Sequence, residues 1–227
     1  MPLEFYFSPT SPSCRAVWML LEHFKGCGAD YEEKVVDVQS GAHETEEYRK
    51  INVFEKVPGL KDGDFCMGES RSIAAYICRQ LEDEKKQDAL YPQDPKCKAK
   101  VDSYLYRDIT ELTKAFDYLN IGGVFFRGET NMCKEYEEDV KNYLDAVEKF
   151  LTENKFIAGN HLTVADFFAY VTTGLIYQLS ENFEDMSSYP KILEWRKHIS
   201  ELSCHKKTYE DPMEMTRNAY RAKRGLQ

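Results

Sequence analysis

The chain has 227 residues, of which 42% are hydrophobic and 30% are charged, a composition typical of a folded protein with one large domain or two smaller ones. Its net charge of −9 excludes the basic surface that a nucleic-acid-binding protein needs. Residues 1–7 contain no charged leader or long apolar run, and the seven cysteines lack CxxC or Cys/His spacing, so we expect a cytoplasmic protein without signal peptide, membrane span or metal site.

The first 82 residues alternate between strand and helix patterns. Apolar residues recur at helical spacing from Val17 to Phe24, and Asp62-Gly63 is typical of a tight hairpin. The predicted elements are a strand at Leu3–Phe7, a helix from Pro12, a strand at Tyr31–Val38, a short helix at His43–Ile51, strands at Gly59-Leu60 and Phe65–Met67, and a helix at Arg71–Leu81. This order, a parallel β-α-β unit joined to a hairpin and a last helix, predicts a thioredoxin-like domain at residues 1–82.

Strand patterns are absent after residue 94. Residues 83–94 are polar and contain a proline, which indicates a linker. Asp94-Pro95 is an N-cap followed by proline at the first helical position. The predicted helices are Pro95 to about Phe116, Met132–Leu151, Asp166–Leu179, Pro190–Leu202 and Met213–Arg224. We therefore expect an all-α domain at residues 95–227.

The helix at Asp166–Leu179 is apolar on nearly every face, so it is predicted to be the buried helix of the bundle. Thr163 and Asp166 have the spacing of a capping box, with Leu162 and Phe167 as the flanking staple, a structural role. We interpret the basic residues from Arg217 onward as surface residues of the last helix rather than as a phosphate-binding site.

Residues 51–73 combine three features that suit a small zwitterionic peptide. Val57 precedes a proline, which holds it extended, so that its N–H and C=O can pair with a peptide; the bond to the proline can be cis. Ser70 is a good N-cap for the helix that follows, and a helix start attracts a carboxylate. Glu69 beside it can hold an ammonium group.

Ser11 ends the loop after the first strand. A helix N-cap followed by proline at the first position explains both Ser11 and Pro12. Alternatively, the Ser11 hydroxyl donates a hydrogen bond to the thiolate of a bound ligand, which the positive end of the helix also favours. A free thiol has a pKa near ~8.5, so it needs such help to ionise at neutral pH.

These motifs resemble the cytosolic glutathione transferases. Residues 51–73 are similar to their glutathione-binding half, Ser11–Val17 to the first-helix motif of the theta, delta and related serine-type classes, and Gly41-Ala42-His43 to their glutathione-loop histidine. Leu105–Asp108 resembles the start of the delta-class second domain, and Thr163–Asp166 the folding motif of the superfamily. The match spans most of the chain, in order and at compatible spacing.

The resemblance implies a thioredoxin-like domain followed by an all-helical bundle, assembled as a homodimer. It implies that glutathione is the co-substrate, with no metal or redox cofactor. The implied reaction conjugates the glutathione thiolate to small hydrophobic electrophiles, or reduces organic hydroperoxides, in detoxification.

The resemblance also implies roles for individual residues. Ser11 would donate to the glutathione sulfur rather than act as a nucleophile. The expected glutathione contacts are His43 and Lys56 at the glycine carboxylate, Val57 at the cysteinyl backbone, and Glu69 and Ser70 at the γ-glutamyl end, with Arg71 nearby or in an ion pair across a dimer interface. By themselves, His43 would be a surface-loop histidine and Lys56 a solvated lysine.

The electrophile pocket is expected along the long helix of the second domain. Half or more of such a helical face is usually core, and the resemblance implies that part of it lines the pocket opposite Pro12 and Ser13. The helix residues assigned to this face are Tyr106, Ile109, Thr113 and Phe116. Glu55 stands where the delta-class pattern has a histidine, and its carboxylate would oppose an anionic ligand unless it points away.

Two other functions fit the same fold. One is a non-enzymatic ligand-binding or structural relative, which an absent Ser11 or Glu69-Ser70 would have favoured. The other is a glutathione-dependent thiol reductase using Cys14, because Ser11–Cys14 is one atom away from the CPxC motif of glutaredoxins. A serine at the first position cannot form a mixed disulfide, which argues against this second function.

Overall fold

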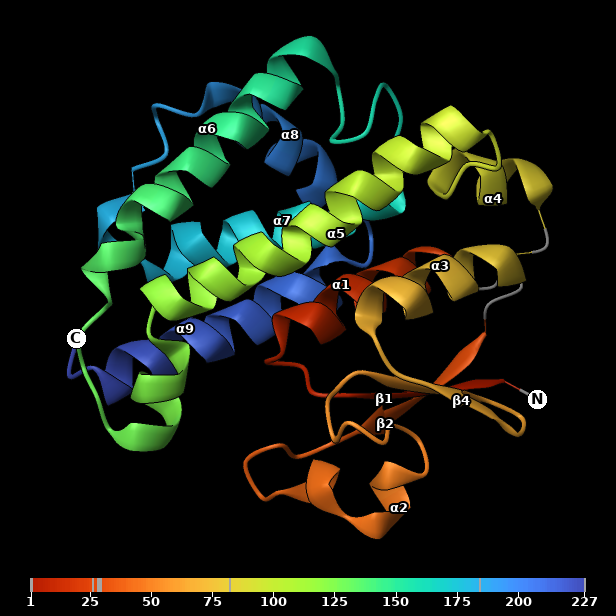
Figure 1. The fold of residues 1–227 in the computed structure, drawn as a ribbon, viewed down its shortest axis with the longest axis horizontal. Coiled ribbons are helices and arrows are strands. Elements are labelled where there is room, and N and C mark those ends of the chain that lie inside the picture. The colour runs from red at the N-terminus through yellow and green to blue at the C-terminus, as the bar shows by residue number, and fades with distance from the viewer. Residues whose placement is uncertain (1, 26, 28–29, 82, 184, 227) are drawn as a thin grey trace.

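A four-stranded sheet and a helical bundle make up the computed structural model, which describes residues 2–25, 27, 30–81, 83–183 and 185–226 (Figure 1). The strands are β1 (Leu3–Phe7), β2 (Tyr31–Val35), β3 (Gly59–Asp62) and β4 (Phe65–Met67). They lie in the order β2-β1-β3-β4, with β1 and β2 parallel and the other pairs antiparallel. The predicted parallel unit joined to a hairpin is confirmed.

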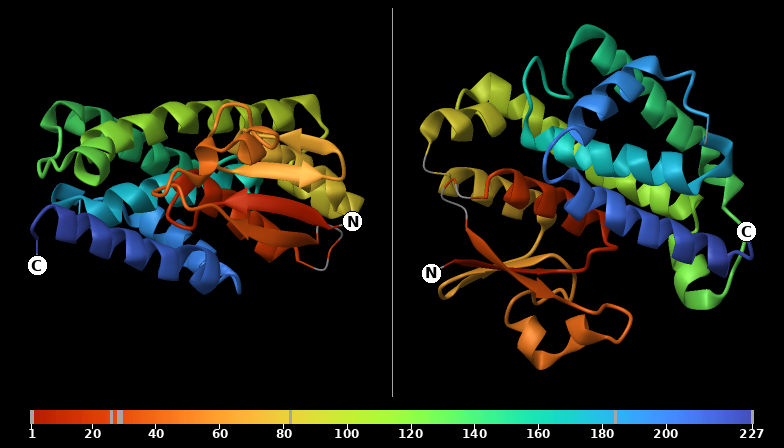
Figure 2. Two further views of the ribbon diagram at one scale, coloured as in Figure 1. Left: turned by 90° about the horizontal axis from the view of Figure 1, so that it is seen from below. Right: turned by 180° about the vertical axis from the view of Figure 1, so that it is seen from behind.

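The helices of the first half cover both faces of this sheet. The helices α1 (Pro12–His23) and α3 (Ser70–Gln80) lie on the face toward the bundle, and α2 (Glu46–Arg49) lies on the opposite side with the short η1 turn (Ala42–Glu44) (Figures 1 and 2). The layered arrangement agrees with the predicted thioredoxin-like fold.

Four predicted elements in this half have other bounds in the structure. The strand predicted at Gly59-Leu60 extends to Asp62, and the helix predicted at Arg71–Leu81 covers Ser70–Gln80. The strand expected at Tyr31–Val38 ends at Val35, because the Asp37 carboxylate accepts hydrogen bonds from the N–H groups of Gln39 and Ser40 and turns the chain. The short helix expected at His43–Ile51 is split into η1 and α2.

The second half is helical throughout, apart from an isolated bridge between Phe156 and Gly159 in the described residues. The segment predicted as a linker contains α4 (Glu84–Leu90), capped by the Asp83 carboxylate. The longer helices are α5 (Pro95–Tyr118), α6 (Glu137–Glu153), α7 (Val164–Leu179), α8 (Pro190–Ser200) and α9 (Asp211–Lys223). Short turns are η2 (Gly123–Arg127), η3 (Lys134–Tyr136), η4 (Glu181–Phe183) and η5 (Lys206–Glu210).

The helix α7 forms the centre of the molecule and packs against both α1 and α5. The helix starts at Val164, two residues before the predicted Asp166, but the predicted capping box is confirmed: the Asp166 Oδ2 accepts from the Thr163 N–H at 2.8 Å and the Thr163 hydroxyl at 3.0 Å. The Asp166 Oδ1 accepts from the Ile157 N–H at 2.9 Å and Trp195 Nε1 at 3.0 Å. One buried carboxylate therefore fixes the start of α7 to α8 and to the turn before it.

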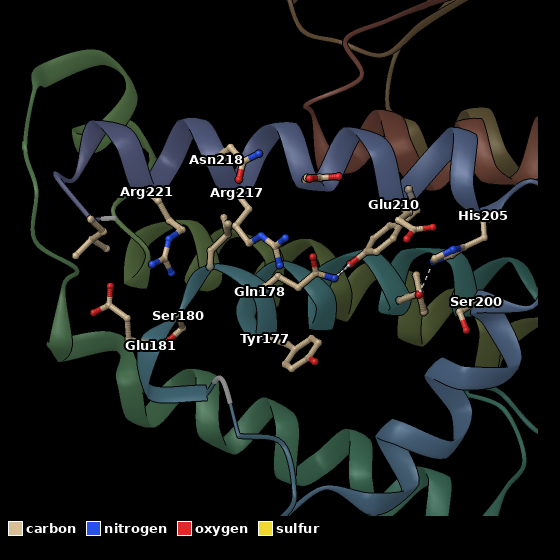
Figure 3. Close-up of a pocket in the computed structure, with 15 residues that line it drawn as sticks. Tyr177, Gln178, Ser180, Glu181, Ser200, His205, Glu210, Arg217, Asn218 and Arg221 are labelled. Carbon is tan, nitrogen blue, oxygen red and sulfur yellow. Dashed lines mark hydrogen bonds between the residues drawn. The ribbon is translucent and has the colours of Figure 1, made fainter.

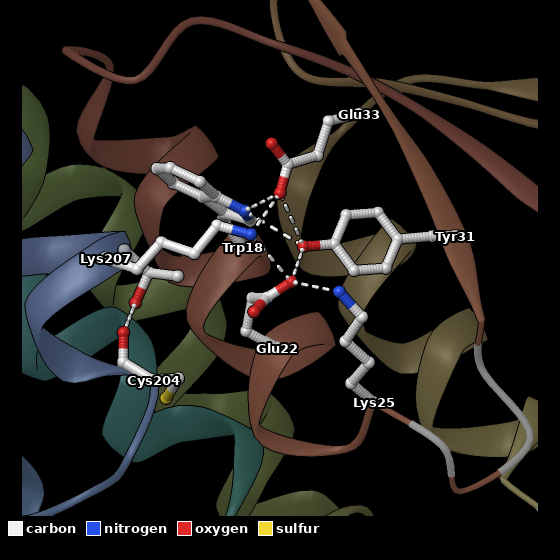
Figure 4. A network of polar contacts seen from close by, with 8 residues as sticks. Trp18, Glu22, Lys25, Tyr31, Glu33, Cys204 and Lys207 are labelled. Carbon is white, nitrogen blue, oxygen red and sulfur yellow. Dashed lines mark hydrogen bonds and ion pairs between the residues drawn. The ribbon is translucent and has the colours of Figure 1, made fainter.

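A polar network joins the sheet half to the helical half (Figure 4). The Lys207 ammonium from η5 forms ion pairs with Glu22 on α1, at 3.0 Å, and with Glu33 on β2. The Tyr31 hydroxyl donates to the Glu22 carboxylate, and Trp18 Nε1 donates to the Glu33 carboxylate at 3.1 Å. This cluster, named here the Lys207 network, holds the C-terminal end of α1 to the second half of the chain.

In the part of the chain that the structure describes, no helix is both long enough and apolar enough to cross a membrane.

Candidate active site

Three chain segments meet at one end of the sheet. The antiparallel register places the end of β1 opposite the start of β3, and the start of β3 opposite the end of β4. The loop before α1, the residues before β3 and the turn before α3 therefore emerge together. The sites predicted at Ser11, Val57 and Ser70 lie on these three segments, so the topology gathers residues that are far apart in sequence.

Ser11 lies at the N-cap of α1. Its side-chain oxygen accepts a hydrogen bond from the Cys14 N–H at 3.5 Å, a long contact, and Pro12 follows as a buried first helical residue. The side chain is half-buried at the positive end of the helix. Ser11 is therefore a helix cap whose hydroxyl proton can still be donated to an anionic ligand.

The loop before β3 presents an extended edge at Val57. The Val57-Pro58 peptide bond is cis, as the sequence allowed. Among the described residues, no group hydrogen-bonds to the N–H or C=O of Val57. The preceding carbonyl, of Lys56, accepts from the Tyr48 hydroxyl and from Asn52 Nδ2, each at 2.7 Å. The edge is thus held in place from behind while Val57 remains available to a peptide ligand.

The turn before α3 differs from the prediction. Glu69, not Ser70, occupies the N-cap position, with a left-handed backbone at φ 66°. Ser70 is the first residue of the helix, and its hydroxyl accepts from Arg71 Nη1 at 3.0 Å rather than from a helical N–H. A non-glycine residue at positive φ is strained, and here it turns the chain sharply so that the helix starts one residue early. Glu69 remains exposed, whereas Ser70 is buried.

Arg71 is paired inside its own chain. Its guanidinium forms an ion pair with the fully buried Asp108 of α5, contacts the Ser13 hydroxyl at 3.4 Å and lies 4.5 Å from the centre of the Phe168 ring. Thr172 donates to the other Asp108 oxygen at 2.8 Å. Burial raises the pKa of Asp108, and Arg71 opposes that rise. The Arg71 guanidinium therefore joins the start of α3 to α5 within one chain.

The residues predicted to bind the glycine end of the ligand lie in η1 and in the loop after α2. His43 is mostly buried, and its Nδ1 has no hydrogen-bond partner among the described residues. Lys56 is exposed. Glu55 forms an ion pair with Arg49 of α2, which neutralises the carboxylate that would oppose an anionic ligand. No hydrogen bond or ion pair among described residues links His43 to Ser11 or Glu69.

The predicted pocket face of α5 is more open than expected. Tyr106 is 74% exposed and Ile109 41% exposed, Thr113 is exposed and Phe116 half-buried. The expectation that half or more of this face is core is wrong, because α5 buries its opposite side, which carries Tyr104, Leu105, Asp108 and Leu112. An exposed aromatic and aliphatic face is thus left beside the sheet half.

Cys14 does not have the properties of a reactive thiol. It is fully buried in α1, and this burial raises the pKa of its thiol to about 12, against the smaller lowering effect of the Ser11 hydroxyl. Within the described residues, no three His, Cys, Asp or Glu side chains form a group suited to a metal ion.

Similarity to known proteins agrees with this arrangement. The family model of the glutathione S-transferase N-terminal domain matches residues 5–85, and that of the C-terminal domain matches residues 109–203. Glutathione S-transferase 1 of Manduca sexta is 36% identical over 211 residues, which cover 91% of this chain and 92% of that protein. The chain belongs to the cytosolic glutathione transferase superfamily.

Two further similar proteins belong to the transferase classes that the sequence motifs resemble, theta and delta. Glutathione S-transferase theta-3 of Mus musculus is 32% identical over 206 residues, covering 88% of this chain and 82% of that protein. A solved delta-class glutathione transferase of Nilaparvata lugens superposes with a TM-score of 0.85 and 29% identity, over 98% of this chain and all of that chain. A theta- or delta-like, serine-type transferase is consistent with both.

The structure adds positioning residues to this transferase that sequence patterns did not indicate. Asn52 is buried between the Val57 loop and the turn before α3, and a Cβ on Gly68 would lie 2.5 Å from its Nδ2. The sequence indicated Asp108 only as part of the Leu105–Asp108 motif, and its pairing with Arg71 is seen only in the structure. Asn52 and Gly68 carry no local signal for this role, since only the packing of β4 against the loop brings them together.

Proposed function

We propose that this transferase conjugates the thiolate of glutathione to small hydrophobic electrophiles. One observation carries the proposal: the Ser11 hydroxyl at the start of α1, the free main chain of Val57 and the turn at Glu69-Ser70 converge at one end of the sheet. A hydroxyl donor, a strand edge and a helix start match the thiol, the peptide backbone and the γ-glutamyl end of glutathione.

Each part of glutathione then has a binding role. Ser11 donates to the sulfur and, with the helix dipole, favours the thiolate. Val57 pairs with the cysteinyl N–H and C=O. Glu69 binds the γ-glutamyl amine, and the Ser70 hydroxyl and N–H bind its carboxylate, with Arg71 providing positive charge behind them.

The glycine end is assigned to His43 and Lys56. The orphaned Nδ1 of His43 supports a hydrogen bond to the glycine carboxylate. Lys56 adds positive charge from the exposed side, while the pairing of Glu55 with Arg49 limits repulsion. These roles rest on position and chemistry rather than on a bound ligand.

The electrophile is assigned to the space between α5 and the start of α1. The exposed Tyr106, Ile109 and Thr113, with Phe116, offer an apolar wall opposite Pro12 and Ser13. Such a wall selects small hydrophobic molecules without specific polar recognition. Organic hydroperoxides of the same size are a second substrate class: the thiolate attacks the terminal oxygen, the O–O bond breaks and the alcohol leaves, and a second glutathione converts the resulting sulfenic acid to glutathione disulfide and water. We assign the activity to detoxification in the cytoplasm.

We further propose that the transferase is a homodimer with domains at residues 1–82 and 95–227, joined by residues 83–94. Exposed apolar residues support the dimer: Val53 is 73% exposed, Phe54 71% and Phe65 50%. A cavity of about 820 Å³ between α5 and α6, with Tyr143, Val147 and Phe150 in its lining, offers an apolar surface for a second copy. Size-exclusion chromatography with light scattering distinguishes a dimer from a monomer.

The proposed reaction is tested with purified protein, glutathione and a panel of aryl halides, epoxides and organic hydroperoxides. We expect conjugation of several members, and titration calorimetry should show glutathione binding that weakens in Glu69→Ala and Ser70→Ala. The exposed Glu47→Ala is the matched control and should bind like the wild type.

Two outcomes would contradict the proposal. Binding of glutathione without turnover on any substrate would favour the non-enzymatic relative. Strong glutathione-dependent disulfide reduction that disappears in Cys14→Ser would favour the reductase, although the burial of Cys14 argues against it.

A further inference from the structure

A guanidinium is buried on α1 without an acidic partner. Arg15 is 0% exposed, and no carboxylate of the described residues forms an ion pair with it. Its Nη1 contacts the Met213 sulfur at 2.9 Å, its Cζ lies 5.5 Å from the centre of the Tyr209 ring, and its Nε and Nη2 have no hydrogen-bond partner in the described chain. A buried charge without a counter-ion costs free energy, so Arg15 is expected to have a use for its charge.

The elements packed against α1 supply no charge that neutralises Arg15. Glu210 and Arg217 line a cavity of about 810 Å³ between α7 and α9 (Figure 3), together with Glu214. The other charged groups of these elements have partners of their own: Arg71 with Asp108, Arg79 with the Tyr91 carbonyl, Lys206 with Asp211, Lys207 with Glu22 and Glu33, and Asp166 with four hydrogen-bond donors. The positive charge of Arg15 is therefore not cancelled by its neighbours.

This charge lies toward the start of α1, where Ser11 is. The Arg15 N–H donates to the Ser11 carbonyl at 3.0 Å, and side chains on a helix lean toward its N-terminal end. Lys207 contacts Glu22 near the end of α1, whereas Met213, further along the chain, contacts Arg15 nearer the start. The segment from η5 to α9 thus runs back along α1 toward Ser11, with the guanidinium between them.

A sulfur at this helix start already experiences the charge of Arg15. Burial raises the pKa of the Cys14 thiol to about 12, and against it the hydrogen bond with the Ser11 hydroxyl and the positive charge of Arg15 both lower that pKa. Arg71 also contacts the first turn of α1, but Asp108 balances its charge. Of these two guanidiniums, only that of Arg15 adds an uncompensated positive charge, in an interior that screens it weakly.

We propose that the buried charge of Arg15 stabilises the glutathione thiolate beside Ser11, an inference that rests on the proposed function. Arg15 does not touch glutathione: the Ser11 hydroxyl donates the hydrogen bond to the sulfur, and Arg15 acts on the anion from inside the protein through its electric field. A nearby cation favours the ionised form of a thiol and so lowers its pKa. Formation of the thiolate in turn offsets part of the cost of burying an unpaired guanidinium.

The experiment follows the thiolate absorbance of glutathione bound to the full-length protein as a function of pH. In Arg15→Met, the pKa of the bound thiol should rise by about 0.5–1 unit, which leaves about three- to tenfold less thiolate at a pH below that pKa. The dissociation constant, measured where the bound thiol is protonated, should stay within about threefold. Arg15→Lys keeps the charge and should restore most of the wild-type pKa.

Met213 offers a second test that leaves Arg15 in place. Met213→Glu puts a carboxylate beside the guanidinium and should raise the pKa of the bound thiol as Arg15→Met does, whereas Met213→Gln, of the same size, should not. Arg196→Met removes another buried guanidinium and controls for lost packing. It should shift the pKa of the bound thiol by less than half as much as Arg15→Met.

Melting temperatures establish which variants are folded, and the two Met213 variants decide the question if Arg15→Met is not. An unchanged thiol pKa in Arg15→Met or in Met213→Glu, or an equal shift in Arg196→Met, would overturn the inference and leave Arg15 with a structural role. If the wild type binds glutathione without lowering the pKa of its thiol below that of free glutathione, the role proposed for Ser11 fails, and this inference fails with it.

Discussion

At the scale of single residues, the candidate site depends on a few side chains that have two roles. Ser11 caps α1, and its hydroxyl is the group that we propose donates to the glutathione sulfur. Arg71 connects the start of α3 to Asp108 in the helical half while supporting Ser70. Substitutions at these positions therefore need a readout that separates folding from chemistry.

Ser11→Ala should keep glutathione affinity within a few-fold and lower kcat by about 10²–10³, the loss typical of one preorganised donor to an anion. The apparent pKa of bound glutathione, followed by thiolate absorbance, should rise. Stability should change little, because the cap contact of 3.5 Å is long.

Thr10→Ala, which removes the neighbouring exposed hydroxyl, is the matched control and should remain near wild type. If Ser11→Ala keeps nearly full conjugation activity, Ser11 acts only as a helix cap and has no role in the reaction.

At the scale of elements, loops and helix starts are held by buried polar groups. Asn52 clamps the loop before β3: its Nδ2 donates to the Lys56 carbonyl, and its Oδ1 accepts from the Phe54 N–H at 3.1 Å. Asp166 does the same for α7, through four hydrogen bonds to one carboxylate. In both cases, the side chain satisfies main-chain groups that would otherwise be unpaired.

Asn52→Ala should raise the KM for glutathione by about tenfold with a much smaller change in kcat, since loss of a buried hydrogen bond costs about 1–3 kcal/mol. Val57 then loses its fixed position, while Ser11 is untouched. Gly68→Ala should act in the same direction, because its Cβ would displace Asn52.

Steady-state kinetics with varied glutathione measure this effect, and Lys50→Ala in the same segment is an exposed control. If Asn52→Ala lowers the melting temperature but leaves the KM for glutathione unchanged, Asn52 contributes to stability and not to glutathione binding.

Asp166 predicts a pH dependence of stability. Burial raises the pKa of Asp166 from 3.8 to about 6, against its hydrogen bonds, so the folded state binds the proton more tightly than the unfolded state. The contribution of Asp166 to the stability of the folded state is therefore fully present below about pH 4 and is lost as the pH rises through about 6. The shift corresponds to about 3 kcal/mol of unfolding free energy.

Chemical denaturation of the wild type and Asp166→Asn from pH 4 to 7 measures the difference. The wild type should lose stability relative to the variant as the pH increases. If the difference in the free energy of unfolding does not change with pH, or if the wild type becomes more stable as the pH rises, the four hydrogen bonds outweigh the effect of burial on the pKa of Asp166.

At the scale of the whole molecule, two halves of different architecture are held together at α1 and at α3. The Lys207 network holds the C-terminal end of α1 (Figure 4), and the ion pair of Arg71 with Asp108 joins α3 to α5. Because α1 also carries Ser11 at its start, these contacts fix the orientation of the candidate site relative to the face of α5.

Lys207→Met should lower the free energy of unfolding by about 1 kcal/mol, because Glu33 then loses its ion pair and Glu22 keeps only the longer pair with Lys25, at 3.5 Å. The value is modest because Lys207 is partly exposed and its pairs are screened by solvent. Lys206→Met is the matched control: its pair with Asp211 is exposed, and it should change stability by less than half as much.

Denaturant unfolding at low and high salt measures both variants, and the effect of Lys207→Met should shrink with salt. Equal effects of the two substitutions would show that the Lys207 network does not fasten the halves.

The sequence by itself determined the order of the elements and most of their positions. Periodicity, Asp62-Gly63, Asp94-Pro95 and the capping box act through local backbone preferences, which is why they could be read without the fold. Only the tertiary structure decided which of these residues share a surface. It moved the cap of α3 from Ser70 to Glu69 and opened the face of α5 to solvent. It also gave Arg71 its partner Asp108 and buried Cys14. These features depend on packing between elements distant in sequence, and no local pattern encodes the free energy of that packing.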